Sequence, residues 1–161
     1  MSFLSHGLTL LVAAFAIYAI GRYYSERLRA LGISLVLGFA ASGVSAQVIK
    51  HLIGRARPRV TDQFVVVGPT FQSGYDSFPS GHSAVAFCFS YILSRYFPRS
   101  RFFFYLFAVA TAFVRVEKTS HFASDVIAGA LVGIIAAKLL LNALSRKGIA
   151  PKGMKAAPAA E

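Results

Sequence analysis

Five hydrophobic segments make up most of this 161-residue chain and limit what it can fold into. They lie at roughly 3–20, 31–49, 83–97, 102–114 and 124–144. An apolar segment of about 20 residues is long enough to cross a bilayer as a helix. Hydrophobic residues form 56% of the sequence and charged residues only 14%, with a mean hydropathy of +0.60, unlike a soluble domain. We therefore expect an all-α, polytopic membrane helix bundle with about five transmembrane helices.

The segments predict one integral membrane domain over residues 1–146, followed by a basic tail at 147–161. The tail is rich in Ala, Lys and Pro, so we expect it to be disordered. The third and fourth segments are short for a bilayer and must use flanking residues or tilt little. In the fifth, Gly129 and Gly133 form a small-x3-small pair that either packs against a neighbouring helix or faces lipid.

The net charge of +11 could indicate a nucleic-acid partner, but the basic residues stand at segment ends rather than along one polar face. We therefore expect no nucleic acid, and a lipid bilayer and a lipid phosphate as partners. Basic residues cluster at 21–30, at 95–101 and in the tail, which the positive-inside rule places in the cytoplasm. The N-terminus and the other connections then lie outside. The compact size suggests a bacterial inner membrane, and nothing in the sequence defines an oligomeric state.

Three groups suited to phosphate chemistry lie where the fourth segment ends and the fifth begins: Arg115, His121 and Asp125. If a helix begins near Ser120, His121 and Asp125 lie at i and i+4 on one face. The carboxylate can then accept a hydrogen bond from one imidazole nitrogen and leave the other free to act as a nucleophile or a base. Arg115 can offer a guanidinium fork to phosphate oxygens. The alternative is that Arg115 and Asp125 form an ion pair closing two membrane helices, with His121 as a cap.

Pro79-Ser80-Gly81-His82 opens the third segment. Ser80 can cap a helix there, and Gly81 lets its backbone approach an anion. The free amides and the helix dipole favour an anion at this end, with His82 suited to protonating a departing oxygen. Taken alone, the motif is more typical of an ordinary capped helix start than of an anion site.

Lys50 closes the second segment, and Arg57-Pro58 follows after six residues. The two cations lie about two turns apart if the helix continues to the proline, so they can converge on one pocket. The alternative is a basic cluster flanking the membrane, together with Arg55 and Arg59.

In this order, Lys50-x6-Arg57-Pro58, Pro79-Ser80-Gly81-His82 and Arg115-x5-His121-x3-Asp125 resemble the three signature motifs of the type 2 phosphatidic acid phosphatase (PAP2) superfamily. The chain is most similar to its membrane lipid phosphatase branch. Two departures are visible: Val114 stands where the family usually has Ser, and the five expected helices are one fewer than the usual six-helix core, in which the helix without a counterpart would be the first.

The resemblance implies a mechanism through a phosphohistidine. His121 would attack phosphorus, Asp125 would orient His121, and His82 would protonate the leaving group. Lys50, Arg57, Ser80, Gly81 and Arg115 would hold the phosphate oxygens, because phosphoryl transfer depends on positioning and electrostatic stabilisation.

The resemblance implies no metal and no cofactor, and the six carboxylates of the chain are too scattered to chelate magnesium. A zinc site from His82, His121 and Asp125 is conceivable by ligand type, although the nearby cations would repel a divalent ion.

The leading hypothesis is therefore a membrane phosphatase that removes a terminal phosphate from a lipid monophosphate or diphosphate. Candidates are undecaprenyl diphosphate, phosphatidylglycerol phosphate, phosphatidic acid and the 1-phosphate of lipid A. One alternative is a non-catalytic protein that binds or transports a lipid phosphate, although binding alone needs only the cations. Another is a membrane-anchored phosphatase for soluble substrates or a haloperoxidase-like site, which the small extramembrane portion disfavours.

Overall fold

Each hydrophobic segment forms one α-helix in the computed structural model, which describes residues 3–150. A short 3-10 helix, η1 (Pro98–Ser100), precedes the fourth, and no strand occurs between residues 3 and 150. The predicted all-α class is confirmed. The helices are α1 (Phe3–Tyr24), α2 (Glu26–Ile53), α3 (Gly81–Tyr96), α4 (Arg101–Glu117) and α5 (Ala123–Arg146).

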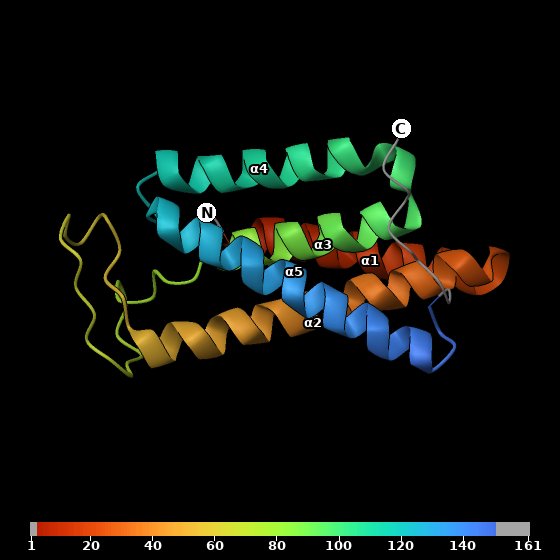
Figure 1. The fold of residues 1–161 in the computed structure, drawn as a ribbon, viewed down its shortest axis with the longest axis horizontal. Helices are drawn as coiled ribbons and strands as arrows, with labels where there is room; N and C mark the ends of the chain where they lie inside the picture. Colours follow the sequence, from red (N-terminus) through yellow and green to blue (C-terminus); the bar gives the residue numbers. More distant parts are fainter. Residues whose placement is uncertain (1–2, 151–161) are drawn as a thin grey trace, which may run out of the picture.

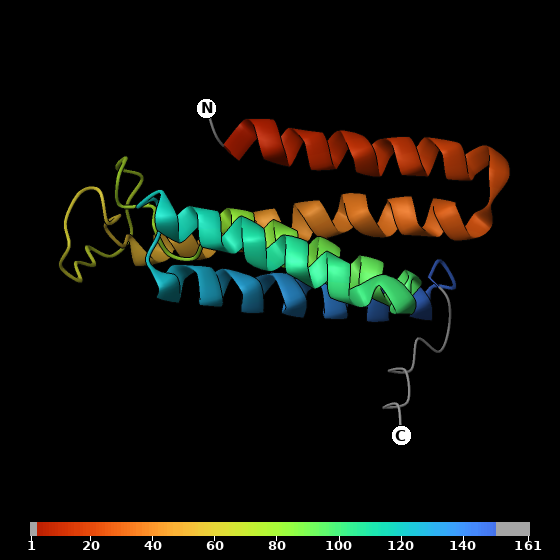
Figure 2. The same cartoon turned by 90° about the horizontal axis from the view of Figure 1, so that it is seen from above.

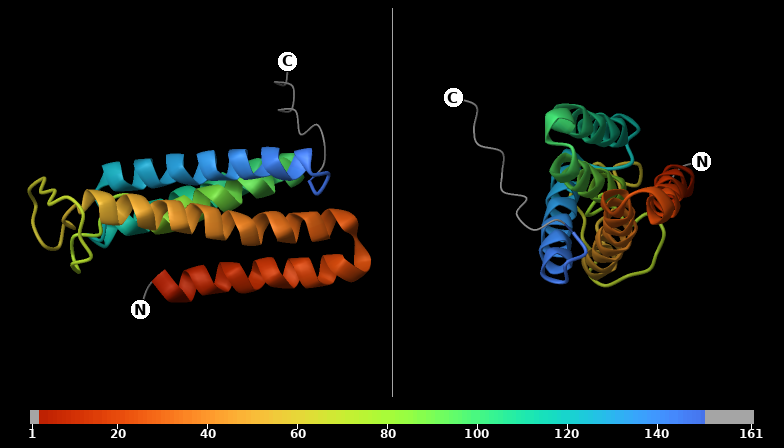
Figure 3. Two further views of the ribbon diagram at one scale, coloured as in Figure 1. Left: turned by 90° about the horizontal axis from the view of Figure 1, so that it is seen from below. Right: turned by 90° about the vertical axis from the view of Figure 1, so that its right-hand side faces the viewer.

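The five helices run side by side along the long axis of the molecule (Figures 1 and 2). Viewed from one end, α3 lies in the middle of the bundle (Figure 3, right). It packs against α2, α4 and α5, while α1 packs mainly against α2. The central position of α3 matters for function because its N-terminus carries the Pro-Ser-Gly-His motif.

Three helices are long and apolar enough to cross a membrane: α1 from Gly7, α2 and α5. With 16 and 17 residues, α3 and α4 are shorter, in keeping with the short segments that predicted them. Both lie alongside the longer helices (Figure 1). Phe102, Phe103 and Phe113 on α4 are each more than two-thirds exposed, so α4 presents an apolar face away from the bundle.

The small residues of α5 lie against α3. A Cβ added at Gly129 would come within 2.4 Å of the Ser80 carbonyl oxygen, and one at Gly133 within 2.0 Å of the Ala84 carbonyl oxygen. Real side chains do not approach a backbone this closely, so the two glycines set the distance between the helices. Of the two readings of this pair, the helix-packing one is correct.

The connections between the helices lie at two opposite ends of the bundle. The α1–α2 turn, the α3–α4 turn and the end of α5 lie at one end, whereas residues 54–80 and the α4–α5 connection lie at the other (Figures 1 and 3). The three sequence motifs therefore meet at the second end. At the first, residues 147–150 form a turn in which Ile149 and Ala150 donate to the Leu144 carbonyl. The remainder of the predicted tail, 151–161, lies outside the described residues.

Candidate active site

The end of α2 places the first motif. The helix stops at Ile53 because Gly54 adopts a left-handed conformation, with φ 62°, and a Cβ there would lie 2.1 Å from the Gly68 carbonyl oxygen. The expectation that the helix continues to the proline is therefore wrong. The chain instead turns and Arg55 forms an antiparallel bridge with Val66. This turn still brings Arg57 to the cavity that Lys50 lines.

The second motif begins α3 at Gly81, with Ser80 at the N-cap position. The predicted side-chain cap is absent: the Ser80 hydroxyl accepts a hydrogen bond from the Ser83 hydroxyl, at 3.1 Å, and bonds no backbone amide of the first turn. The Ser80 N–H donates to the Asp125 carbonyl at 2.9 Å. The start of α3 is thereby fixed to the start of α5.

The third motif includes a chain reversal. Thr119 has a positive φ of 49°, and the Arg115 carbonyl accepts the N–H groups of both Ser120 and His121 at 3.2 Å. The following helix begins only at Ala123, so His121 precedes it and does not share a helical face with Asp125. The helix start predicted near Ser120 is wrong by three residues.

His121 is almost fully buried and is held by a backbone carbonyl. Its Nδ1 lies 2.8 Å from the Ser77 carbonyl oxygen and 3.8 Å from Asp125 Oδ2. Because a carbonyl oxygen can only accept, Nδ1 carries the proton and Nε2 of the neutral ring keeps its lone pair. Burial lowers the pKa of His121 below its ordinary value of 6.5, although the Asp125 carboxylate opposes this shift.

The carboxylate of Asp125 is fully buried and accepts three short hydrogen bonds. Oδ1 accepts from Arg55 Nη1 at 2.5 Å. Oδ2 accepts from the Ser77 hydroxyl at 2.5 Å and from the Phe122 N–H at 2.9 Å. The ion-pair alternative named Arg115 as the partner of Asp125, but the partner in the structure is Arg55.

Arg55 is only 7% exposed, and its guanidinium group contacts other residues besides Asp125. Nη1 also donates to the Ser124 hydroxyl at 2.7 Å. The charged group lies over the rings of Phe64 and Phe122, at 4.7 and 4.3 Å from their centroids. Sequence reasoning treated Arg55 as one of a basic cluster and overlooked Ser77, because no spacing pattern links either residue to position 125.

Arg57 forms a bidentate ion pair inside the site. Its Nε and Nη2 donate to the two carboxylate oxygens of Asp76, at 2.8 and 2.6 Å. Burial alone raises the pKa of Asp76, but the hydrogen bonds and positive charge of Arg57, with the charge of Lys50, lower it to about 2. Asp76 therefore stays ionised and fixes the direction of the Arg57 guanidinium group.

These elements enclose a polar cavity of about 290 Å³. Four cationic side chains and one carboxylate line it, so its field favours an anion. Ser80 and Asp125 are fully buried and are not among its lining residues. The lining residues are Gln47, Lys50, Arg57, Arg59, Asp76, Gly81, His82, Arg115, Ser120 and His121.

Six of the eight site residues expected from the sequence thus line one cavity: Lys50, Arg57, Gly81, His82, Arg115 and His121. The other two support it, since Asp125 stands beside His121 and Ser80 binds the Asp125 backbone. Between residues 3 and 150, no three His, Cys, Asp or Glu side chains gather where they could hold one metal ion.

Known proteins resemble this chain in sequence and in fold. A lipid A 1-phosphatase of Rhizobium etli is 37% identical over 106 residues, which cover 64% of this chain and 46% of the relative. The corresponding enzyme of Rhizobium johnstonii is 34% identical over 125 residues, covering 74% and 50%. This chain therefore spans about half the length of these relatives.

The fold is similar to that in the crystal structure of Aquifex aeolicus LpxE. The TM-score is 0.54 at 20% sequence identity, and the match covers 86% of this chain and 84% of the other. The sequence pattern of the PAP2 superfamily matches residues 31–149, which include all three motifs. This chain belongs to the PAP2 superfamily.

Proposed function

We propose that this protein is an integral membrane lipid phosphatase that hydrolyses a terminal phosphate from a lipid phosphate or diphosphate through a phosphohistidine. The observation that carries the proposal is the hydrogen bond from His121 Nδ1 to the Ser77 carbonyl at 2.8 Å. It leaves Nε2 with a lone pair on a ring that lines a cavity with four cations. A fixed neutral imidazole beside an anion site is the arrangement that nucleophilic attack on phosphorus needs.

In the first step, His121 Nε2 attacks phosphorus and the bond from phosphorus to the lipid oxygen breaks. His82 gives its proton to that oxygen, and the lipid alcohol or lipid monophosphate leaves. Lys50, Arg57 and Arg115 stabilise the charge on the phosphoryl oxygens. In the second step, His82 removes a proton from water, which attacks phosphorus and releases inorganic phosphate and neutral His121.

Asp125 contributes a negative charge 3.8 Å from His121 Nδ1. The charge stabilises the ring when it becomes cationic in the phosphohistidine. Because the Ser77 carbonyl already accepts the hydrogen bond from Nδ1, we assign Asp125 two roles, one electrostatic and one structural. In its structural role, the Asp125 carboxylate accepts a hydrogen bond from the Ser77 hydroxyl and so fixes Ser77, whose carbonyl orients His121.

The names of the relatives favour the 1-phosphate of lipid A among the candidate lipids. We infer further that the protein lies in a bacterial inner membrane, with the site on the periplasmic face, the N-terminus outside and the C-terminus inside. The basic residues support this orientation, since outside the site they concentrate at the opposite end of the bundle.

The test measures phosphate release by the purified protein in detergent from lipid A, undecaprenyl diphosphate, phosphatidylglycerol phosphate, phosphatidic acid and a soluble phosphate ester. We expect release from one or more lipids. His121→Ala should lower kcat at least about a thousandfold, because no other nucleophile replaces the imidazole. EDTA should leave the rate unchanged.

Full activity in His121→Ala would exclude the phosphohistidine route. A loss of activity in EDTA that zinc or magnesium restores would favour a metal mechanism. Binding of a lipid phosphate without any release would favour the non-catalytic binding or transport function.

A further inference from the structure

The side chain of Gln47 lines the polar cavity, although none of the three motifs includes it. It is exposed on α2, where it is flanked by Val44 and Val48, which are 62% and 53% exposed. Lys50 follows one turn later on the same face of the helix. No hydrogen bond or ion pair joins the Gln47 side chain to another residue between positions 3 and 150. The amide therefore has its donors and its acceptor available for a ligand in the cavity.

Gln47 lies at the level of the bundle where α3 begins. Farther from the site, Gly38 of α2 lies against Ile92 and Cys88 of α3. The two helices run in opposite directions (Figure 1). Gln47 is nine residues beyond Gly38, about 14 Å by the helical rise, and is therefore level with α3 residues about nine positions before this contact. These residues include His82, which lines the same cavity.

The proposed reaction places the departing group at this level. His82 protonates the departing oxygen, so the atoms bonded to that oxygen lie close to His82. Lys50, which binds the phosphate, is one turn nearer to the site end of α2 than Gln47. Gln47 therefore faces the atoms next to the phosphate ester and not the phosphate itself.

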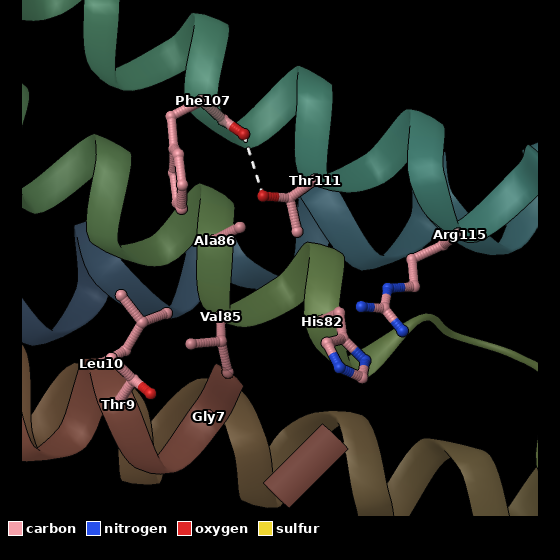
Figure 4. A pocket seen from close by; sticks show the side chains of 9 residues that line it. All are labelled: Gly7, Thr9, Leu10, His82, Val85, Ala86, Phe107, Thr111 and Arg115. Atoms are coloured by element: carbon pink, nitrogen blue, oxygen red, sulfur yellow. Dashed lines mark hydrogen bonds between the residues drawn. The ribbon is translucent and has the colours of Figure 1, made fainter. Parts of the chain in front are cut away.

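The wall on the other side of His82 is mostly apolar. His82 lies at one end of a smaller cavity, of about 160 Å³, between α1, α3 and α4 (Figure 4). Val85 of α3 and Phe107 of α4 contribute apolar side chains to it, and the Thr111 hydroxyl donates to the Phe107 carbonyl at 2.9 Å. A hydrogen-bonding group beside the departing oxygen therefore finds its partner on the polar side, where Gln47 lies.

The Gln47 amide can distinguish lipids by the groups next to the phosphate ester. Its NH2 group donates to oxygens, which every candidate lipid offers, whereas its carbonyl oxygen needs an N–H or O–H group from the ligand. On the carbon next to the one that bears the phosphate, lipid A has an amide N–H and phosphatidylglycerol phosphate has a hydroxyl. Phosphatidic acid has an ester at that position and undecaprenyl diphosphate has a hydrocarbon chain, so neither supplies a donor.

We propose that Gln47 is a specificity-determining residue, whose carbonyl oxygen accepts a hydrogen bond from an N–H or O–H group beside the scissile phosphate ester. The inference rests on the proposed lipid phosphatase function. It narrows the substrates to lipids whose phosphate is carried by a sugar or glycerol unit with such a donor on the adjacent carbon. A substrate that enters the cavity displaces water from the amide. A lipid without the donor then leaves the oxygen unpaired, and sites built to bind an N–H or O–H group reject such analogues.

Replacement of the amide tests this assignment. Gln47→Met keeps the length of the side chain and removes its hydrogen-bonding groups. The matched control is Gln63→Met, at an exposed residue in the loop 54–80 and outside the cavity wall. The measured quantity is kcat/KM for the four candidate lipids, and thermal unfolding in detergent checks that each variant is folded. A fifth substrate is an analogue of the better donor lipid, with hydrogen in place of the phosphatidylglycerol phosphate hydroxyl or an ester in place of the lipid A amide.

For the unsubstituted protein, we expect the highest kcat/KM with lipid A or phosphatidylglycerol phosphate. Gln47→Met should lower this value about tenfold, as expected for the loss of one hydrogen bond. It should change the values for phosphatidic acid and undecaprenyl diphosphate by less than about twofold. The analogue should be about tenfold poorer than its parent lipid for the unsubstituted protein but no poorer for Gln47→Met, because both changes remove the same hydrogen bond. Gln63→Met should retain the original values.

A highest kcat/KM with phosphatidic acid or undecaprenyl diphosphate would overturn the assignment of Gln47 and leave the phosphatase in place. An equal fall for all four lipids in folded Gln47→Met would also overturn it, since a structural role produces a general loss. Unchanged hydrolysis of the donor lipids by Gln47→Met would do the same. Absence of hydrolysis of every lipid by the unsubstituted protein would overturn both proposals.

Discussion

The Arg55 side chain joins parts of the chain that are distant in sequence. It pairs with Asp125 of α5, donates to Ser124 and lies over the rings of Phe64, on the long loop, and Phe122. Because Arg55 does not line the polar cavity, it acts on the reaction through Asp125 and not on the phosphate directly. We assign it as a positioning residue.

Arg55→Met should lower stability by about 3 kcal/mol, because it leaves Asp125 as a buried charge without its cation. It should also lower kcat with little change in KM, since the cations that hold the phosphate remain. Stability is measured by denaturant unfolding in detergent and the kinetic constants on the best lipid of the panel.

The matched control for Arg55→Met is Arg29→Met at the other end of the bundle. Arg29 pairs with Glu26, but both side chains are exposed, at 46% and 82%. Its loss should cost less than about 1 kcal/mol and leave kcat unchanged. Arg55→Lys should recover part of the activity lost in Arg55→Met. A rise in KM alone in Arg55→Met would instead make Arg55 a phosphate ligand.

The pH behaviour of His121 follows from its burial. Desolvation disfavours the imidazolium form, so the folded-state pKa lies below 6.5 and the neutral nucleophile persists to lower pH than in an exposed histidine. An NMR titration of the histidine side chains in detergent should give His121 a midpoint below 6.5. The His121→Ala variant identifies its resonance. A midpoint above 6.5 would mean that the charge of Asp125 outweighs burial.

At the scale of helices, close packing through small residues joins α3 to its neighbours. Gly129 and Gly133 bring α5 against α3, and a Cβ at Gly38 of α2 would lie 2.6 Å from Ile92 Cδ1 and 3.0 Å from the Cys88 sulfur of α3. Because α3 and α5 carry the second motif and Asp125, their separation also sets the geometry of the site. The hydrophobic pattern predicted the helices to within a few residues but left the partners of these glycines open.

Gly133→Ala should destabilise the bundle by about 1–2 kcal/mol. The new Cβ must push the Ala84 backbone away, and the resulting strain exceeds the higher helix propensity of alanine. Gly43→Ala in α2 is the control, because nothing lies within 4 Å of its added Cβ. Thermal midpoints in detergent should fall for the first variant and stay level or rise slightly for the second. Equal midpoints would mean that α3 and α5 separate without cost.

For the whole molecule, the distribution of charge distinguishes the two ends. The polar cavity and its cations occupy one end, while Arg22, Arg27 and Arg29 flank the α1–α2 turn at the other (Figure 1). If the positive-inside rule governs insertion, the second end faces the cytoplasm and the site faces outward.

Cysteine labelling tests this orientation, since Cys88 is buried and gives a silent background. Ser73→Cys lies on the long loop at the site end, and Tyr24→Cys, at a residue that is 83% exposed, lies at the opposite end. A membrane-impermeant maleimide applied to cells with a permeabilised outer membrane should label Ser73→Cys. Tyr24→Cys should react only after the inner membrane is broken. The reverse pattern would place the site in the cytoplasm.

The sequence by itself determined the five helices, the family resemblance and six residues that line the cavity. These follow from local information. Hydrophobic runs predict helices, and residues at the ends of neighbouring membrane helices lie close together at the same end of the bundle. Only the tertiary structure decided that α2 stops at Ile53, where Gly54 takes a left-handed conformation and its backbone packs against the Gly68 carbonyl too closely for a Cβ. It also decided that the Ser77 carbonyl holds His121 and that Arg55 pairs with Asp125. These contacts join residues 44 and 70 positions apart, and no local periodicity encodes a pairing at that distance.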